Sequence, residues 1–205
     1  MKFLPTAVVI SALLLSDGAA FAAPTATLNG VLMQPAGIED TFIGSKQAPA
    51  TLIVYSSPTC GHCVDFEKKV LPDLERKYVQ TGKLKISIRP FVRNVVDAAI
   101  FLIAEQAGQE RYRKTLAAFT DRYEEIVAAT ERKGVMSEIA ASQGIDQPHF
   151  EQALKNEAHL RKLENLRDQA MQQLEIRGTP TFFLNGERLA YDGTVASFDK
   201  ALTPN

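Results

Sequence analysis

The alternation of apolar and polar positions divides the chain into strand-like and helix-like segments. Residues 51–56 (TLIVYS) form a continuous apolar, β-branched run, which is typical of a buried strand. Residues 61–81 carry apolar side chains at helical spacing, and residues 83–90 (KLKISIRP) alternate like a second strand. A strand, a helix and a strand in this order predict a βαβ unit with parallel strands and a right-handed crossover.

The helix over 61–81 is expected to bury one apolar face and to bend at Pro72, since proline removes a backbone donor. The residues expected to face inward are Val64, Phe66, Val70, Leu71, Leu74 and Tyr78.

From about 95 to 176 the pattern is helical throughout, so we predict a helical insert there. The expected helices cover 95–107, 110–128, 136–143, 148–156 and 158–174, with Gly108, Gly134 and 144–148 between them. A strand over 181–184, a turn at Asn185-Gly186, a strand over 188–191 and a helix over 194–202 complete the chain. The result is an α/β fold, a small mixed sheet flanked by helices.

The first residues predict export. Residues 1–22 combine Lys2, an apolar run over 7–15 and an A-x-A pattern at 20–22, as a cleaved signal peptide does. The run is too short for a spanning helix, which needs roughly 20 apolar residues. We interpret 23–40 as an N-terminal tail, with an edge strand near 41–43, and 41–205 as one domain. The net charge of −1 argues against a nucleic-acid partner.

The two cysteines of the chain, Cys60 and Cys63, lie three positions apart where the first strand meets its helix. A disulfide between them would close so small a ring that it would stabilise the fold by only about 2 kcal/mol. The same geometry suits reversible redox chemistry. The helix N-terminus favours a thiolate on Cys60, so we predict that Cys60 is the exposed nucleophile and Cys63 the buried, resolving thiol. His62 between them would lower the pKa of Cys60 as an imidazolium.

Metal binding by the pair is the alternative chemistry. A structural zinc site needs four ligands, and His149 and His159 would have to come from the distant insert, so we expect no metal site. Copper(I) favours soft thiolates, and a copper-handling protein would be expected to have its methionines clustered. Here Met33, Met136 and Met171 are scattered along the chain.

A second informative segment is Gly178-Thr179-Pro180, just before the strand over 181–184. Pro180 is either ordinary punctuation at the start of a strand or part of a cis peptide bond. The residues themselves leave both possibilities open.

The signal peptide, T-C-G-H-C, the helical insert and R-G-T-P-T-F-F-L-N-G together resemble the DsbA-like, thioredoxin-fold thiol-disulfide oxidoreductases of bacterial envelopes. The resemblance runs from about 40 to 202. It implies a thioredoxin fold with a helical insertion that acts as a lid, a periplasmic location and no cofactor. It also implies that Cys60 and Cys63 are the redox pair, that Pro180 is a cis-proline facing them, and that the Thr179 backbone hydrogen-bonds an extended substrate peptide.

Two positions depart from the family pattern. DsbA-type oxidases usually carry Cys-Pro-His-Cys, whereas this chain has the Gly61-His62 dipeptide of eukaryotic protein disulfide isomerases. Thioredoxin-fold enzymes often have a buried acid six positions before the first cysteine, where this chain has Val54. Either a water or another group therefore accepts the proton of Cys63, or Cys63 reacts more slowly than in relatives. The sequence assigns the acceptor role to neither Arg89 nor Glu67.

The family resemblance predicts an enzyme that forms disulfides in unfolded or partly folded exported proteins and exchanges electrons with a membrane redox partner. An isomerase or reductase is the closest alternative. Dedicated bacterial isomerases carry a sizeable dimerisation region, for which 24–40 is too short, so a monomeric oxidase is expected. A peptide-binding or copper-binding periplasmic protein is the alternative from another class.

Overall fold

A computed structural model describes residues 28–202, which contain a five-stranded mixed sheet in the order β1-β3-β2-β4-β5. The strands are β1 (Phe42–Ile43), β2 (Ala50–Ser56), β3 (Leu84–Pro90), β4 (Thr181–Leu184) and β5 (Glu187–Leu189). β2 and β3 are parallel, and the other neighbouring pairs are antiparallel. The predicted βαβ unit, the edge strand near 41–43 and the hairpin at Asn185-Gly186 are therefore confirmed.

The helix that follows β2 is continuous but not uniformly α-helical. It consists of α2 (Gly61–Asp65), the π-helical stretch η1 (Phe66–Val70), α3 (Leu71–Leu74) and the π-helical stretch η2 (Glu75–Val79). All the apolar positions that were expected to face inward on this helix are buried. The first π-helical stretch, η1, precedes Pro72, and at its end the Leu71 N–H bonds to the Phe66 carbonyl. The second stretch, η2, follows Pro72.

The insert consists of helices, as predicted, with two differences in detail. Its helices are α4 (Val95–Gln106), α5 (Gln109–Asp121), α6 (Tyr123–Ala128), α7 (Arg132–Ser142), α8 (Gln147–Leu154) and α9 (Glu157–Gln173). The single helix expected over 110–128 is broken at Arg122, and Gly134 lies inside α7 instead of ending a helix. Neither glycine content nor apolar spacing signals these boundaries, because the tertiary packing of short helices decides them.

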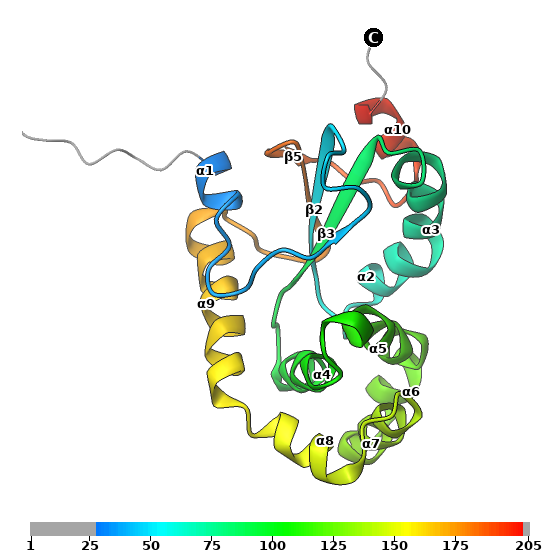
Figure 1. The fold of residues 1–205 in the computed structure, drawn as a ribbon, viewed down its shortest axis with the longest axis vertical. Coiled ribbons are helices and arrows are strands. Elements are labelled where there is room, and N and C mark those ends of the chain that lie inside the picture. Colours follow the sequence, from blue (N-terminus) through cyan, green and yellow to red (C-terminus); the bar gives the residue numbers. More distant parts are fainter. Residues whose placement is uncertain (1–27, 203–205) are drawn as a thin grey trace, which may run out of the picture.

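The sheet lies between two helical layers (Figure 1). α9 and the short α1 (Leu28–Leu32) cover one face, and α2, α3 and α10 (Ala196–Leu202) cover the other, while α4 to α8 form a block at one end of the sheet. The sequence of β2 is apolar throughout because both of its faces are buried. Leu52 and Val54 pack toward α3 and α10, and Ile53 and Tyr55 pack toward α9. The insert has a core of its own around Phe119 and Phe150.

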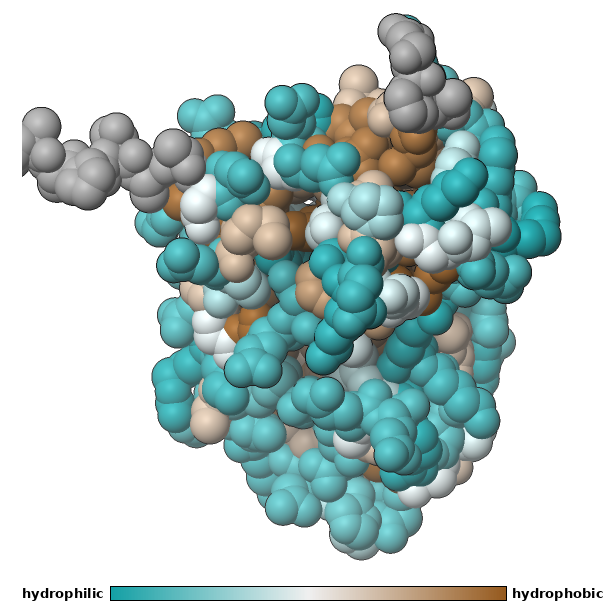
Figure 2. Space-filling model, turned by 45° about the horizontal axis from the view of Figure 1, so that its top comes forward, coloured by the Kyte–Doolittle hydropathy of each residue, from teal (hydrophilic) through white to brown (hydrophobic). Residues whose placement is uncertain are grey.

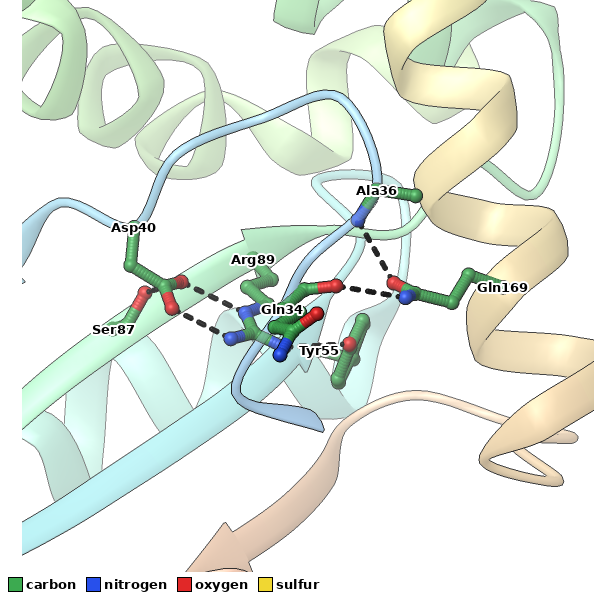
Figure 3. A network of polar contacts seen from close by, with 7 residues as sticks. All are labelled: Gln34, Ala36, Asp40, Tyr55, Ser87, Arg89 and Gln169. Atoms are coloured by element: carbon green, nitrogen blue, oxygen red, sulfur yellow. Dashed lines mark hydrogen bonds and ion pairs between the residues drawn. The ribbon is translucent and has the colours of Figure 1, made fainter. Parts of the chain in front are cut away.

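The segment before β1 is bound to the sheet rather than forming a loose tail. Leu32 of α1 is fully buried, and Gln169 of α9 bonds to the backbone of Gln34 and Ala36. Asp40 forms a bidentate ion pair with buried Arg89, with oxygen–nitrogen distances of 2.7 and 2.6 Å (Figure 3). The signal peptide expected at 1–22, and residues 23–27, lie outside the described residues.

Hydrophobic surface is unevenly distributed on the face shown in Figure 2, where the lower part is mostly hydrophilic and brown patches gather toward the upper edge. Among residues 28–202, no helix is long and apolar enough to cross a membrane.

Candidate active site

The two cysteines lie where β2 passes into α2. Cys60 is the N-cap residue, with an extended backbone (φ −105°, ψ 114°), and its carbonyl accepts hydrogen bonds from the N–H groups of Cys63 and Val64. Cys60 and Cys63 are not joined by a disulfide in this structure, and Cys63 is fully buried. Cys60 was expected to be exposed, but it retains only 7% of its accessible surface because the segment before β4 packs over it. Cys60 is more exposed than Cys63, as predicted, but the prediction that Cys60 is an exposed residue was wrong.

The environment separates the acidities of the two thiols. The pKa of Cys60 is lowered to about 5, mainly because the Cys63 thiol hydrogen-bonds to the Cys60 sulfur, with smaller contributions from Thr179 and from the positive charge of Arg93. Burial raises the pKa of Cys63 far above its ordinary value. Cys60 is therefore a thiolate at neutral pH while Cys63 holds its proton, which is the division of roles expected of a nucleophile and a resolving thiol.

The strand opposite the cysteines begins with a cis peptide bond between Thr179 and Pro180, as the family resemblance implied. Cys60 Sγ lies 3.2 Å from the Thr179 carbonyl oxygen, to which the protonated thiol donates. Thr179 Oγ1 is buried without a hydrogen bond of ordinary geometry among residues 28–202. This hydroxyl, unlike the carbonyl, can donate to the Cys60 sulfur, which is how Thr179 lowers the pKa of Cys60, or it can turn toward a bound molecule.

An open groove of about 520 Å³ runs beside this point. It is lined by His62, Asp65, Lys69, Thr179, Pro180, Tyr191, Asp192 and Gly193. His62 is exposed at this groove, and the groups that lower the pKa of Cys60 are Cys63, Thr179 and Arg93. The electrostatic role of His62 therefore stays a prediction, and its position favours contact with a bound molecule.

Val54 is apolar at a position where relatives often carry an acid. The structure distinguishes between Arg89 and Glu67 as candidates for the proton acceptor of Cys63. Val54 is fully buried. The Arg89 guanidinium is occupied by Asp40 and Tyr55 on the other face of the sheet (Figure 3), and as a permanent cation it accepts no proton. Glu67 is half-buried, one helical turn after Cys63, and its Oε1 accepts a hydrogen bond from Ser56 Oγ at 2.8 Å. Burial raises the pKa of Glu67.

Sequence reasoning missed Asp97, which the structure brings next to the cysteine loop. This α4 carboxylate is fully buried and accepts hydrogen bonds from Ser57 and Thr59, the residues just before the redox pair. An Asp at the start of a helix is usually a surface residue that interacts with the helix dipole, so nothing in the local pattern indicated a contact that spans about 40 positions.

Metal-ligating side chains do not gather elsewhere in the described part of the chain. Within residues 28–202 there is no group of three or more His, Cys, Asp or Glu side chains placed to hold an ion. His149 Nδ1 lies 2.6 Å from Asp146 and His159 Nδ1 lies 3.7 Å from Glu105, so each imidazole has a carboxylate partner of its own within the insert.

Comparison with known proteins agrees with this geometry. The thioredoxin family model matches residues 37–203. A Rickettsia prowazekii protein that is named as a protein-disulfide oxidoreductase is 25% identical over 170 residues, which cover 80% of this chain and 61% of that protein. The chain therefore spans only about three fifths of this relative's length. Disulfide bond formation protein D of Bacillus subtilis is 23% identical and is matched over 82% of this chain and 80% of its own length.

Solved structures show the same fold. Wolbachia pipientis alpha-DsbA1 superposes with a TM-score of 0.77 at 23% identity, covering 86% of this chain and 94% of that one. A protein-disulfide isomerase from Novosphingobium aromaticivorans has a TM-score of 0.69 at 26% identity, covering 82% and 97% respectively. From the family match and the shared fold, we conclude that this chain belongs to the thioredoxin family and has the thioredoxin fold with a helical insertion that is found in DsbA proteins.

Proposed function

We propose that this protein is a thiol-disulfide oxidoreductase that forms disulfide bonds in exported proteins. The observation that carries the proposal is the separation of the two thiols, since Cys60 has a pKa of about 5 beside a Cys63 whose pKa is raised by burial. A low-pKa sulfur leaves readily from a mixed disulfide, so its reduced form is favoured and the disulfide is oxidising.

The reaction follows from these roles. A client thiolate attacks Cys60 Sγ of the Cys60–Cys63 disulfide, so a client–Cys60 bond forms and the electron pair of the broken bond passes to the Cys63 sulfur, which takes up a proton. A second client thiolate attacks the client sulfur, forms the client disulfide and releases Cys60 as a thiolate. The pair thus gains the electrons that the client loses, and a disulfide of a membrane redox partner reoxidises it.

Thr179 and Pro180 border the groove in which the client segment is proposed to bind. The Thr179 carbonyl accepts a hydrogen bond only from a protonated Cys60 thiol, so it is available to a backbone N–H of the client when Cys60 is in a disulfide or is a thiolate. Such backbone contacts suit unfolded or partly folded clients of varied sequence. The charged residues Asp65, Lys69 and Asp192 at the rim add polar contacts, and His62 is placed to contact the client next to the reacting sulfur.

Glu67 is our candidate for the group that exchanges a proton with Cys63. Its raised pKa makes its carboxylate a better proton acceptor than an exposed glutamate. It is linked to the cysteine loop through Ser56, which precedes the Ser57 whose N–H contacts Cys63 Sγ at 3.5 Å. On this proposal it takes the place of the acid that is missing at Val54.

The location and assembly belong to the same proposal. Residues 1–22 serve as the cleaved signal peptide, residues 23–40 lead into the domain, and residues 41–205 act in the periplasm as a monomer. The name of the Bacillus subtilis relative, a disulfide bond formation protein, supports the oxidase direction.

An isomerase or reductase is the second candidate, which the Gly61-His62 dipeptide and the likeness to the Novosphingobium isomerase structure favour. Trapping the thiols of growing cells with an alkylating reagent separates the two. A pair that is mostly disulfide in the cell supports the oxidase, whereas a pair that is mostly dithiol supports the isomerase or reductase.

The activity itself is tested by mixing the oxidised protein with reduced, unfolded ribonuclease and measuring the recovery of ribonuclease activity. We expect recovery with the wild type and none above background with Cys60→Ser. Equal recovery with that variant would refute the proposed function.

A further inference from the structure

Asp97 is a buried carboxylate whose hydrogen bonds go to the residues around the redox pair. Ser57 Oγ lies 2.9 Å from both of its oxygens, and Thr59 donates its hydroxyl at 2.7 Å and its N–H at 3.1 Å. The Arg93 N–H donates at 2.9 Å. A carboxylate without exposed surface is stable only when donors replace its lost water, and these groups do so.

The start of α4 does not need Asp97 for its own cap. Asn94 is the N-cap, and its Oδ1 accepts the N–H groups of Val96 and Asp97. Asn94 Nδ2 also donates to Thr59 Oγ1 at 2.9 Å, so the loop before Cys60 is fixed to the insert at two neighbouring points. The hydrogen bonds of the Asp97 side chain therefore hold the loop in place, in addition to the local cap.

The loop that Asp97 holds contacts the sulfur of Cys63 and the backbone of Cys60. The Ser57 N–H points at Cys63 Sγ, 3.5 Å away, and the Cys60 N–H bonds back to the Ser57 carbonyl at 3.1 Å. Thr59 sets the direction from which the chain enters Cys60, whose own side chain makes no capping bond. If Ser57 turned away, Cys63 would lose the N–H that stabilises its thiolate when it attacks.

We propose that Asp97 is a positioning residue of the redox centre, which holds Ser57 and Thr59 so that the Ser57 N–H supports the Cys63 thiolate and Cys60 faces Thr179. The inference deepens the proposed function and rests on it. It assigns to the insert, through α4, a part in the reactivity of Cys63.

Ellman's reagent separates the two cysteines in one experiment on the reduced protein. In the first phase the Cys60 thiolate attacks the reagent, forming a mixed disulfide and releasing one thionitrobenzoate. In the second phase the Cys63 thiolate attacks Cys60 Sγ, closes the Cys60–Cys63 disulfide and releases the second thionitrobenzoate. The rate of the second phase therefore measures the reactivity of Cys63.

Asp97→Asn removes the charge and puts an amide donor where acceptors are needed. If Asp97 acted only through its charge, the loss of a negative group would favour both thiolates and speed the second phase. Positioning predicts the opposite, a second phase slowed by about tenfold or more, as expected for the loss of a hydrogen bond to a charged group. Asp146→Asn is the charge control, since Asp146 caps α8 within the insert and asparagine caps equally well.

Thr59 offers a matched pair in case Asp97→Asn does not fold. Thr59→Ser keeps the hydroxyl, whereas Thr59→Val has the same shape and loses it, and neither changes the charge. We expect wild-type kinetics from Thr59→Ser and Asp146→Asn, and a slowed second phase from Thr59→Val. The inference is overturned if folded Asp97→Asn has an unchanged or faster second phase, or if Thr59→Val matches Thr59→Ser. Absence of both phases in the wild type would instead refute the proposed function.

Discussion

At the scale of single residues, the acidities of Cys60 and Cys63 differ because the Cys63 thiol hydrogen-bonds to the Cys60 sulfur while Cys63 itself is fully buried. The position of Cys60 as the N-cap of α2 also suits an anion. The direction of this contrast was predictable, because the spacing of the cysteines places Cys60 at the strand-to-helix boundary and Cys63 one turn deeper. The near burial of Cys60 was not predictable, because it depends on Thr179, which is 119 positions away.

The acidity of Cys60 predicts how the reduced protein responds to pH. Thiolate ultraviolet absorbance should appear with a midpoint near pH 5 in the wild type and be absent at that pH in Cys60→Ser. A cysteine in an unfolded chain has a pKa of about 8.5, so Cys60 is a stronger acid in the folded protein than in the unfolded one. The contribution of Cys60 ionisation to the stability of the fold is therefore complete above about pH 8.5 and is lost as the pH falls through 5.

Chemical denaturation of reduced wild type and Cys60→Ser measures this contribution. The stability difference in favour of the wild type should grow as the pH rises from 5 to 8.5. A difference that is independent of pH, or a thiolate midpoint above pH 8, would show that Cys60 has no special acidity.

Glu67 should govern the proton of Cys63. We expect Glu67→Gln to slow the attack of Cys63 on a Cys60 mixed disulfide by about a hundredfold, which is the low end for general base catalysis, and to flatten the pH dependence of that step. Adding Val54→Glu to this variant should restore part of the rate, because the new acid occupies the position used by relatives. Unchanged rates in both variants would mean that water alone handles the proton.

At the scale of elements, the apolar periodicity predicted the βαβ unit, the hairpin and the helical character of the insert, because each depends on local pattern and turn chemistry. The pattern could not show where Arg122 breaks α5 from α6, or that α2 and α3 are interrupted by π-helical stretches. Nor did it show that α1 forms and buries Leu32, since five helical residues are stable only through their packing on the sheet.

The end of β1 gives a prediction at this scale. Gly44 has φ +101°, and a Cβ there would lie 2.6 Å from Val79 Cγ1 and 3.0 Å from the Leu84 carbonyl oxygen. Gly82 also has a positive φ of +72°, but open space surrounds its Cβ position. Both alanine variants force a strained backbone, which costs about 1–2 kcal/mol.

Gly44→Ala must in addition displace the Val79 side chain and press on the Leu84 carbonyl. Its free energy of unfolding should therefore fall further than that of Gly82→Ala, by about 1–3 kcal/mol as for overpacking. Urea denaturation of the two variants measures the difference. Equal losses would mean that the edge of the sheet accommodates the methyl group, and the packing of β1 against η2 would need revision.

At the scale of the whole molecule, the redox centre is assembled from parts that are distant in the chain. The cysteines lie at the start of α2, Thr179 and Pro180 precede β4, and Asp97 belongs to the insert. The sequence pointed to the first two parts because each has a recognisable motif. Asp97 has none, since its role depends on how α4 packs against the end of the sheet (Figure 1).

Trapping a client on Cys60 tests the proposed nucleophile directly. Cys63→Ala leaves Cys60 without a resolving partner, so, after Cys60 is activated as a mixed disulfide with thionitrobenzoate, it should capture a reduced unfolded protein as a covalent adduct that dithiothreitol releases. Cys60→Ala treated in the same way should capture none, because the remaining thiol is buried and protonated. Adducts on Cys60→Ala as abundant as those on Cys63→Ala, or none on either variant, would contradict the assignment of Cys60 as the reacting sulfur.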